Sequence, residues 1–160
     1  MSDTVSPLIA VLHDTHRRAL AAFAQPAEVL ARTYAPGKWT ARQMLFHIAD
    51  TESAFLDRLR RSLADAKPLY WALDPDRWTA RLVTPNRDLS VAGHLFDASR
   101  RSYLDLVANI TTEEWDRTGV HSDFGLLTIR DLVTKCGWHA GHHLGQVEAA
   151  IAGTVWVKPN

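Results

Sequence analysis

Four segments of helical length constrain the fold of this chain more than any other feature of the sequence. They cover residues 7–24, 40–66, 90–109 and 128–153, and each repeats apolar residues three or four positions apart. Apolar residues at this spacing line one face of a helix, which must be buried against other elements. No convincing pair of alternating strands lies between these segments. The pattern therefore predicts an all-α fold, a four-helix bundle.

The ends of these segments carry helix-start signals. Ser6 precedes a proline, which suits a serine cap followed by proline at the first helical position. Thr40 and Gln43 have the spacing of a capping box, in which each side chain binds the other residue's backbone. Ser90 can cap the third helix, and the fourth is expected to begin at Thr128.

The connection between the second and third helices is long. Residues 67–89 lack a sustained period and contain three prolines. This length predicts a crossover connection rather than a tight hairpin between helices. Its aromatic residues Tyr70, Trp71 and Trp78 could line the mouth of a pocket, or they could simply cap the core. Residues 119–125 are expected to form a loop or a small extended excursion.

The composition sets further limits. With 160 residues, the chain is expected to form one domain over residues 1–160. Its 18 basic and 18 acidic residues cancel, which argues against binding to nucleic acid or to an anionic membrane surface. Residues 1–7 do not resemble a signal peptide, and no apolar run is long enough for a membrane span. Cys136 is the single cysteine, so a cytoplasmic location is expected.

Two histidines four positions apart, His139 and His143, are the clearest functional signal. Positions four apart on a helix lie on the same side, about 6 Å from each other, so both imidazoles could hold one metal ion. On the second helix, His47 also lies at the rim of the buried face. We predict that these three histidines form one divalent metal site, which leaves an open position for water or substrate.

The other candidate ligands have weaker patterns. The helical period points His142 outward and places His94 opposite the apolar face of its helix, where it is expected to be solvated. His16 remains an outside candidate because it lies nearer the apolar face of the first helix. Cys136 could be a fourth ligand or a redox-sensitive neighbour, although a small buried residue is the more common role for such a cysteine.

Two polar residues near the histidines are candidate catalytic or supporting groups. Gln146 could form a hydrogen bond with a ligand histidine or with a bound water. Asp50, about one turn beyond His47, could orient that histidine or act as a base, or it could be a solvated surface residue. No glutamate stands between His139 and His143 as an obvious general base. A di-iron site is disfavoured because the second and fourth helices lack a Glu-x-x-His motif.

Two stretches of the chain resemble a known family. Residues 37–52 resemble the second-helix signature of the DinB-like (YfiT-like) superfamily. Residues 125–129 together with 138–147 resemble its last-helix signature. The resemblance covers roughly residues 8–152, and the two signatures occur in the expected order and spacing.

This resemblance implies a four-helix bundle, often a homodimer, with a divalent metal ion held by three histidines. The matching positions are His47, His139 and His143, and the family binds zinc or nickel. Its members are metal-dependent enzymes that transfer low-molecular-weight thiols, isomerise thiol adducts or are named hydrolases.

We therefore expect a metal-dependent enzyme that acts on a small-molecule substrate. It would activate either water, as a hydrolase, or a low-molecular-weight thiol, as a thiol transferase. The alternative is a non-catalytic module that binds a small ligand or forms a dimer, with a structural metal or none. A fourth protein ligand, from Cys136 or His16, would favour that alternative.

Overall fold

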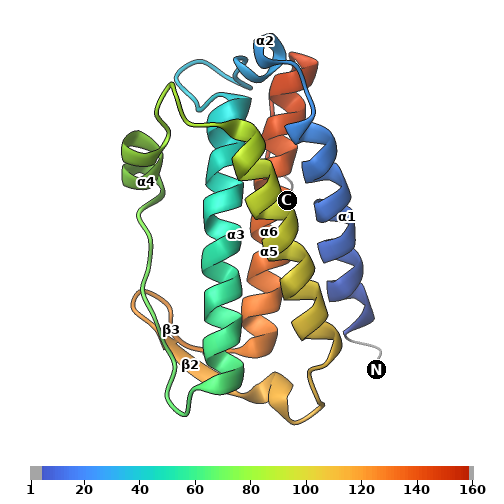
Figure 1. Ribbon diagram of the computed structural model, residues 1–160, viewed down its shortest axis with the longest axis vertical. Coiled ribbons are helices and arrows are strands. Elements are labelled where there is room, and N and C mark those ends of the chain that lie inside the picture. Colours follow the sequence, from blue (N-terminus) through green and yellow to red (C-terminus); the bar gives the residue numbers. More distant parts are fainter. Residues whose placement is uncertain (1–4, 159–160) are drawn as a thin grey trace.

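The computed structural model describes residues 5–158, and its main elements are four long helices that lie side by side (Figure 1). They are α1 (Ser6–Phe23), α3 (Ala41–Ala64), α5 (Leu89–Ala108) and α6 (Ile129–Ala152). Each of these helices packs against two main neighbours, so that α3 contacts α5 and α6 while α1 contacts the same two helices from the opposite side. The predicted four-helix bundle is confirmed.

The direction of the helices confirms the long crossover. In Figure 1, α1 runs upward and α3 downward, and the connection 65–88 then returns along the outside of the bundle. Consequently α5 runs parallel to α3, and α6 runs antiparallel to both. The start of α5 is tied to that of α3, because Nη2 of Arg42 donates to the carbonyl oxygen of Arg87 at 2.6 Å.

Six shorter elements join the long helices. They are α2 (Ala27–Leu30), β1 (Leu69–Tyr70), α4 (Pro75–Leu82), the short 3₁₀ helix η1 (Glu114–Asp116), β2 (Thr118–His121) and β3 (Gly125–Thr128). The strands form one sheet in the order β1-β2-β3, in which β2 pairs parallel to β1 and antiparallel to β3. The expectation of no strand pair is wrong, because strands of two to four residues are too short to display an alternating pattern.

The capping signals of the two helices nearest the site are confirmed. The Thr40 side chain accepts from the backbone N–H of Gln43, whose side chain accepts from the Thr40 backbone. Thr128 and Asp131 form the same reciprocal pair at the start of α6. These caps fix where α3 and α6 begin, and therefore which residues each helix turns inward.

Two expectations about helix starts are corrected. Val5 precedes α1 without a side-chain cap, so Ser6 is the first helical residue rather than the cap. Asp88 caps α5 and accepts from the backbone N–H of Ser90, which lies inside the first turn. The connection over residues 67–89, in which the sequence shows no sustained period, contains the helix α4, which begins after the cap Asp74.

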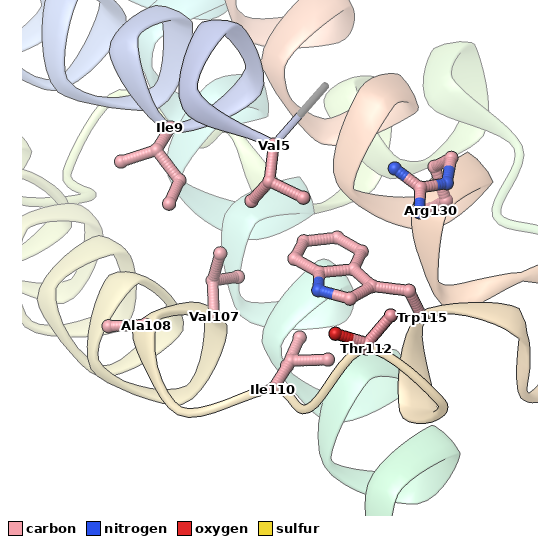
Figure 2. Close-up of a pocket in the computed structure, with 8 residues that line it drawn as sticks. All are labelled: Val5, Ile9, Val107, Ala108, Ile110, Thr112, Trp115 and Arg130. Carbon is pink, nitrogen blue, oxygen red and sulfur yellow. The ribbon is translucent and has the colours of Figure 1, made fainter. Parts of the chain in front are cut away.

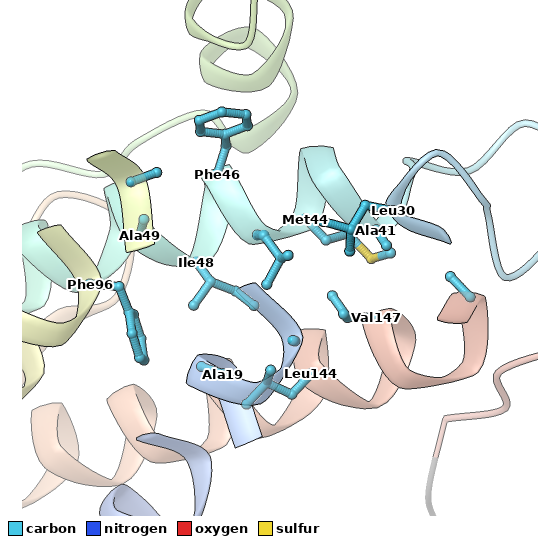
Figure 3. Packing of buried hydrophobic residues seen from close by; sticks show 14 residues of the cluster. Ala19, Leu30, Ala41, Met44, Phe46, Ile48, Ala49, Phe96, Leu144 and Val147 are labelled. Atoms are coloured by element: carbon cyan, nitrogen blue, oxygen red, sulfur yellow. The ribbon is translucent and has the colours of Figure 1, made fainter. Parts of the chain in front are cut away.

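The main apolar core fills the α2 end of the bundle (Figure 3). Phe46 and Ile48 of α3 lie in this cluster with Phe96 of α5 and with Leu144 and Val147 of α6. These side chains are almost fully buried, and burial of each one contributes roughly 1.5–3 kcal/mol to folding. The cluster therefore holds α3 and α6 firmly against each other next to the predicted metal site.

A small cavity lies at the opposite end of the bundle (Figure 2). Its volume is about 60 Å³, and its walls include Val5, Ile9, Val107 and Trp115. The Arg130 guanidinium carbon lies 5.3 Å from the centre of the Trp115 ring. This space is too small for an organic ligand, because such pockets usually measure at least several hundred Å³.

A buried ion pair, which the sequence patterns did not indicate, joins all four long helices. The Nε and Nη2 atoms of Arg100 each donate to an oxygen of Glu52 at 2.7 Å. Nη1 donates to the Leu12 carbonyl oxygen and to Oγ1 of Thr15, both at 2.8 Å. The Sγ atom of Cys136 lies 3.8 Å from both Glu52 oxygens. We refer to Arg100, Glu52, Thr15 and Cys136 as the Arg100 cluster.

No helix within residues 5–158 combines the length and the apolar character that crossing a bilayer requires.

Candidate metal centre

The structure brings the three predicted histidines together. His47 comes from α3, while His139 and His143 come from successive turns of α6. One ring nitrogen from each lies within 4.8 Å of the others, and the Nε2 atoms of His47 and His139 are 3.1 Å apart. We call this group the histidine triad. Its convergence follows from the antiparallel packing of α3 against α6.

Burial keeps the triad uncharged at neutral pH. It lowers the pKa of His47 to about 4 and is the largest cause that lowers the pKa of His143 to about 3. Burial also lowers the pKa of His139 well below its ordinary value, and the other histidines lower it further. A neutral imidazole retains a lone pair on one nitrogen, so each member of the triad can act as a metal ligand.

Gln146 makes one of the two contacts that the sequence suggested for it, a hydrogen bond with a histidine of the triad. Its Oε1 atom accepts from Nδ1 of His143 at 2.8 Å, which places the proton on Nδ1 and leaves the Nε2 lone pair free. The Gln146 amide nitrogen donates to the Tyr34 hydroxyl and to Nε2 of His142, both at 3.3 Å. His142 was expected to face outward, but it is half-buried in this network.

Asp50 lies elsewhere. Its two carboxylate oxygens accept from the guanidinium of Arg87, with distances of 2.5 and 2.7 Å. Three residues beyond His47, Asp50 is rotated about 60° around the helix and faces the start of α5. No hydrogen bond joins it to the triad in the part of the chain that the structure describes. The predicted role of Asp50 in orienting His47 therefore has no contact to support it.

The candidate fourth ligands also have other partners. Cys136 belongs to the Arg100 cluster, and burial raises the pKa of its thiol well above the ordinary value, so it is not a thiolate. His16 lies 2.7 Å from an Asp97 oxygen on α5. Within residues 5–158, only the triad forms a group of three or more potential metal ligands. His94 is exposed, as the helical period predicted.

A cavity of about 350 Å³ opens beside the triad. It lies between α3, α6, the segment that follows β1, and the β2–β3 hairpin, and all three histidines line it. Its other walls are mostly apolar and include Trp39, Phe55, Leu132 and Trp138. The Trp39 ring centre is 5.3 Å from that of His47, and Phe55 packs 5.7 Å from His139. The cavity is therefore large enough for a small organic molecule that reaches the triad.

The aromatic residues expected at the pocket mouth do not line this cavity. Tyr70 is 3% exposed, and its hydroxyl oxygen lies 2.5 Å from the Ser62 Oγ atom. Trp71 is 79% exposed, and Trp78 is partly exposed on α4. The connection between α3 and α5 instead contributes Ala72, Leu73 and Pro75 to the walls.

His121 is a cavity residue that the sequence did not reveal. It is buried on β2, and its Nδ1 atom accepts from the Asp123 backbone N–H at 3.1 Å, which leaves the ring proton on Nε2. Exposed and buried residues alternate along β2, but four residues are too few for this signal to identify a strand. His121 lines the cavity because the β2–β3 hairpin folds over it, and this position does not follow from the sequence pattern.

Comparisons with known proteins agree with this architecture. Residues 11–147 match the model of the DinB superfamily. A protein of Oceanobacillus iheyensis is 30% identical over 78% of this chain and 72% of its own length. A protein of Halalkalibacterium halodurans is 25% identical over the same shares of the two chains. Both relatives are provisionally named metal-dependent hydrolases.

Two solved structures share the fold. YfiT from Bacillus subtilis superimposes with a TM-score of 0.81 at 22% identity, over 92% of this chain and 86% of its own. TT2238, a four-helix bundle protein, superimposes with a TM-score of 0.63 at 22% identity, over 91% and 98%. With the match that spans most of the sequence, these findings lead to one conclusion: the chain belongs to the DinB superfamily.

Proposed function

We propose that His47, His139 and His143 bind one divalent metal ion, zinc or nickel, and that the protein is a metal-dependent hydrolase of a small molecule. One observation carries this proposal. Three neutral imidazoles, that of His47 buried and the other two half-buried, hold their ring nitrogens within 4.8 Å of one another at the wall of a cavity of about 350 Å³.

The donor set fits such an ion. Two nitrogen ligands of a tetrahedral zinc ion lie about 3.3 Å apart, because each zinc–nitrogen bond measures about 2.0–2.1 Å. The Nε2 atoms of His47 and His139 are 3.1 Å apart. Three protein ligands with a cavity on one side are typical of a catalytic site, whereas a structural site is closed by four. Cys136, a candidate fourth ligand on α6, is held in the Arg100 cluster.

Each part of the site has a chemical role in this proposal. A divalent ion supplies Lewis acidity and lowers the pKa of a water or thiol that it binds. Burial keeps the histidines neutral, and Gln146 holds the His143 proton on Nδ1. The rings of Trp39 and Phe55 keep bulk water away from the triad and strengthen electrostatic interactions with a bound substrate.

Hydrolysis is preferred to thiol transfer because the relatives are provisionally named hydrolases. The two reactions are separated by a screen of esters and amides with protein purified without a histidine tag, in the presence and absence of a low-molecular-weight thiol. Hydrolysis predicts turnover without thiol that is lost on chelation and restored by zinc or nickel. Turnover that requires thiol would replace this proposal with thiol transfer.

The alternative to an enzyme is a non-catalytic module that binds a small ligand or forms a dimer. It predicts saturable binding of a small ligand without turnover of any ester, amide or thiol acceptor. The homodimer and the cytoplasmic location also remain predictions. Analytical ultracentrifugation tests the first, and cell fractionation tests the second.

A further inference from the structure

Two cationic side chains line the cavity on the side of the β2–β3 hairpin. Arg58 lies on α3, eleven residues after His47, and Lys135 lies on α6, four residues before His139. Eleven residues are close to three helical turns, so Arg58 shares the face of His47 about 16 Å further along the helix. Because α3 and α6 are antiparallel, both cations lie beyond the triad in the same direction.

An aromatic ring, that of Phe55, lies between Arg58 and the triad, and a second ring packs against Lys135. The Phe55 ring centre is 5.7 Å from that of His139, and the guanidinium carbon of Arg58 is 5.5 Å from the Phe55 ring centre. Nζ of Lys135 on α6 lies 4.0 Å from the centre of the ring of Phe124, which belongs to the β2–β3 hairpin. A ligand whose apolar body rests on Phe55 would therefore have the triad at one end and the cations at the other.

Neither cation has a carboxylate partner among residues 5–158: none of the ion pairs within 4.0 Å includes Arg58 or Lys135. Nη2 of Arg58 donates to the Trp71 carbonyl oxygen at 2.8 Å, which anchors the guanidinium without neutralising it. Both side chains are half-buried. Asp57 and Asp131 act on these cations only from beyond ion-pair distance. A cation that is partly removed from water without a directly bound carboxylate favours an anionic ligand.

The positive charges of Arg58 and Lys135 both affect His121, which lines the cavity. Burial lowers the pKa of His121, and the positive charges of Arg58 and Lys135 lower it further, while Asp123 opposes them. Asp123 is the single acidic residue among the described residues that line the cavity, and it is exposed. Two cations and one carboxylate leave one net positive charge, which suits a singly charged carboxylate better than a doubly charged phosphate.

We propose that Arg58 and Lys135 form an anion subsite that binds the carboxylate of a small organic substrate, whose apolar body lies across Phe55 toward the histidine triad. The role of this molecule as a substrate rests on the proposed function, whereas its binding does not. In a hydrolysable ester or amide of this class, the scissile group and the carboxylate lie at opposite ends of the cavity.

The test measures binding to metal-free protein, so that the carboxylate cannot be held by the ion. The probes are N-benzoylglycine and its uncharged amide, N-benzoylglycinamide, measured by calorimetry or ligand-observed NMR. We expect the carboxylate to bind about tenfold more tightly, a typical effect of charge-assisted hydrogen bonds. Arg58→Met and Lys135→Met should each reduce this preference without changing the affinity for the amide.

Two further variants control for charge and position. Arg58→Lys keeps the charge and should retain most of the preference. Arg60→Met removes an exposed arginine from α3 outside the cavity and should change nothing. Equal affinities for the two probes, no saturable binding, tighter binding of phenyl phosphate, or a preference that survives the double Arg58→Met and Lys135→Met variant would each overturn the proposal. Metal content is measured in a separate experiment. A protein that binds no metal can therefore be distinguished from one that does not bind the carboxylate.

Discussion

The histidine triad and the Arg100 cluster are two polar groups inside the bundle that both include side chains of α3 and α6, and their chemistry differs. Glu52 lies five residues after His47 on α3, and Cys136 lies three residues before His139 on α6. In the Arg100 cluster the guanidinium donates to a carboxylate, a carbonyl and a hydroxyl. The triad instead gathers neutral nitrogens at a cavity, without a countercharge. Buried polar groups that satisfy one another stabilise a fold, whereas groups left facing a cavity indicate a ligand.

The largest expected effect comes from breaking the Arg100 cluster. Arg100→Met would leave the Glu52 carboxylate buried without its cation. Removing one partner of a buried pair typically costs about 3–5 kcal/mol, because the remaining charge is uncompensated. We expect the free energy of unfolding, measured by urea titration, to fall by about this amount.

Two further variants show whether the loss of stability comes from the unpaired Glu52 charge. Arg61→Met removes an exposed ion pair with Asp57 on α3 and should leave the stability unchanged within error. Replacing both Arg100 by Met and Glu52 by Leu should recover most of the lost stability, because no unpaired charge remains. A loss for Arg100→Met no larger than that for Arg61→Met would show that the cluster is not a stabilising unit.

Removing one member of the triad should have the next largest effect, on metal binding. Loss of a residue that only supports a ligand typically weakens metal affinity 10–100-fold, so loss of a ligand should exceed about 100-fold. We expect His139→Ala to show this in competition titrations with a chromophoric chelator. His94→Ala, an exposed histidine on α5, is the control and should bind metal normally. Equal affinities of the two variants would contradict the assignment of His139.

The hydrogen bond from His143 to Gln146 should matter less than a ligand itself. Gln146→Leu removes the acceptor that holds the His143 proton on Nδ1. We expect metal affinity to fall about 10–100-fold while the protein still binds one ion per chain. The control is Gln25→Leu, because the Gln25 side chain donates to the Ala21 carbonyl oxygen on α1 and does not line the cavity. Unchanged affinity in Gln146→Leu would mean that packing alone orients His143.

The last effect depends on pH and concerns the histidine triad rather than the Arg100 cluster. Burial lowers the pKa of His47 to about 4 in the folded protein, below its ordinary value of 6.5. Below about pH 6.5 the unfolded chain therefore binds a proton that the folded metal-free chain excludes. Stability is complete above that pH and falls as the pH drops toward 4, by about 1.4 kcal/mol per pH unit for this residue.

Urea titrations of metal-free protein between about pH 7 and pH 5 measure this slope. His47→Leu should reduce it, whereas Arg61→Met should leave it as it is. Equal slopes in the native protein and in His47→Leu would show that His47 does not titrate as its burial implies.

The sequence predicted the features that depend on local spacing. The capping pair of Thr40 and Gln43 and the four-residue spacing of His139 and His143 are helix-local signals, and they placed the helices and the converging histidines correctly. Of the two partners considered for Gln146, a triad histidine or a bound water, the structure shows the histidine, His143, one turn away.

The features that sequence reasoning missed depend on contacts between distant segments. Asp50 has the spacing to support His47, but Arg87, 37 residues away, holds its carboxylate. Cys136 lies on the histidine stripe, yet Glu52 and Arg100 surround it. His121 lies on a strand of four residues, too short to be recognised from its pattern, and it reaches the cavity because the hairpin folds over it. One sequence contains little information about such pairings.

X-ray absorption at the metal edge, on protein loaded with zinc or nickel and with its metal content measured, shows whether the histidine triad binds the ion. The account predicts about one ion per chain, with imidazole nitrogens from three histidines at roughly 2.0–2.1 Å and an oxygen from solvent. No bound ion after loading would contradict it, and so would a sulfur ligand at roughly 2.3 Å, because that ligand would have to be Cys136.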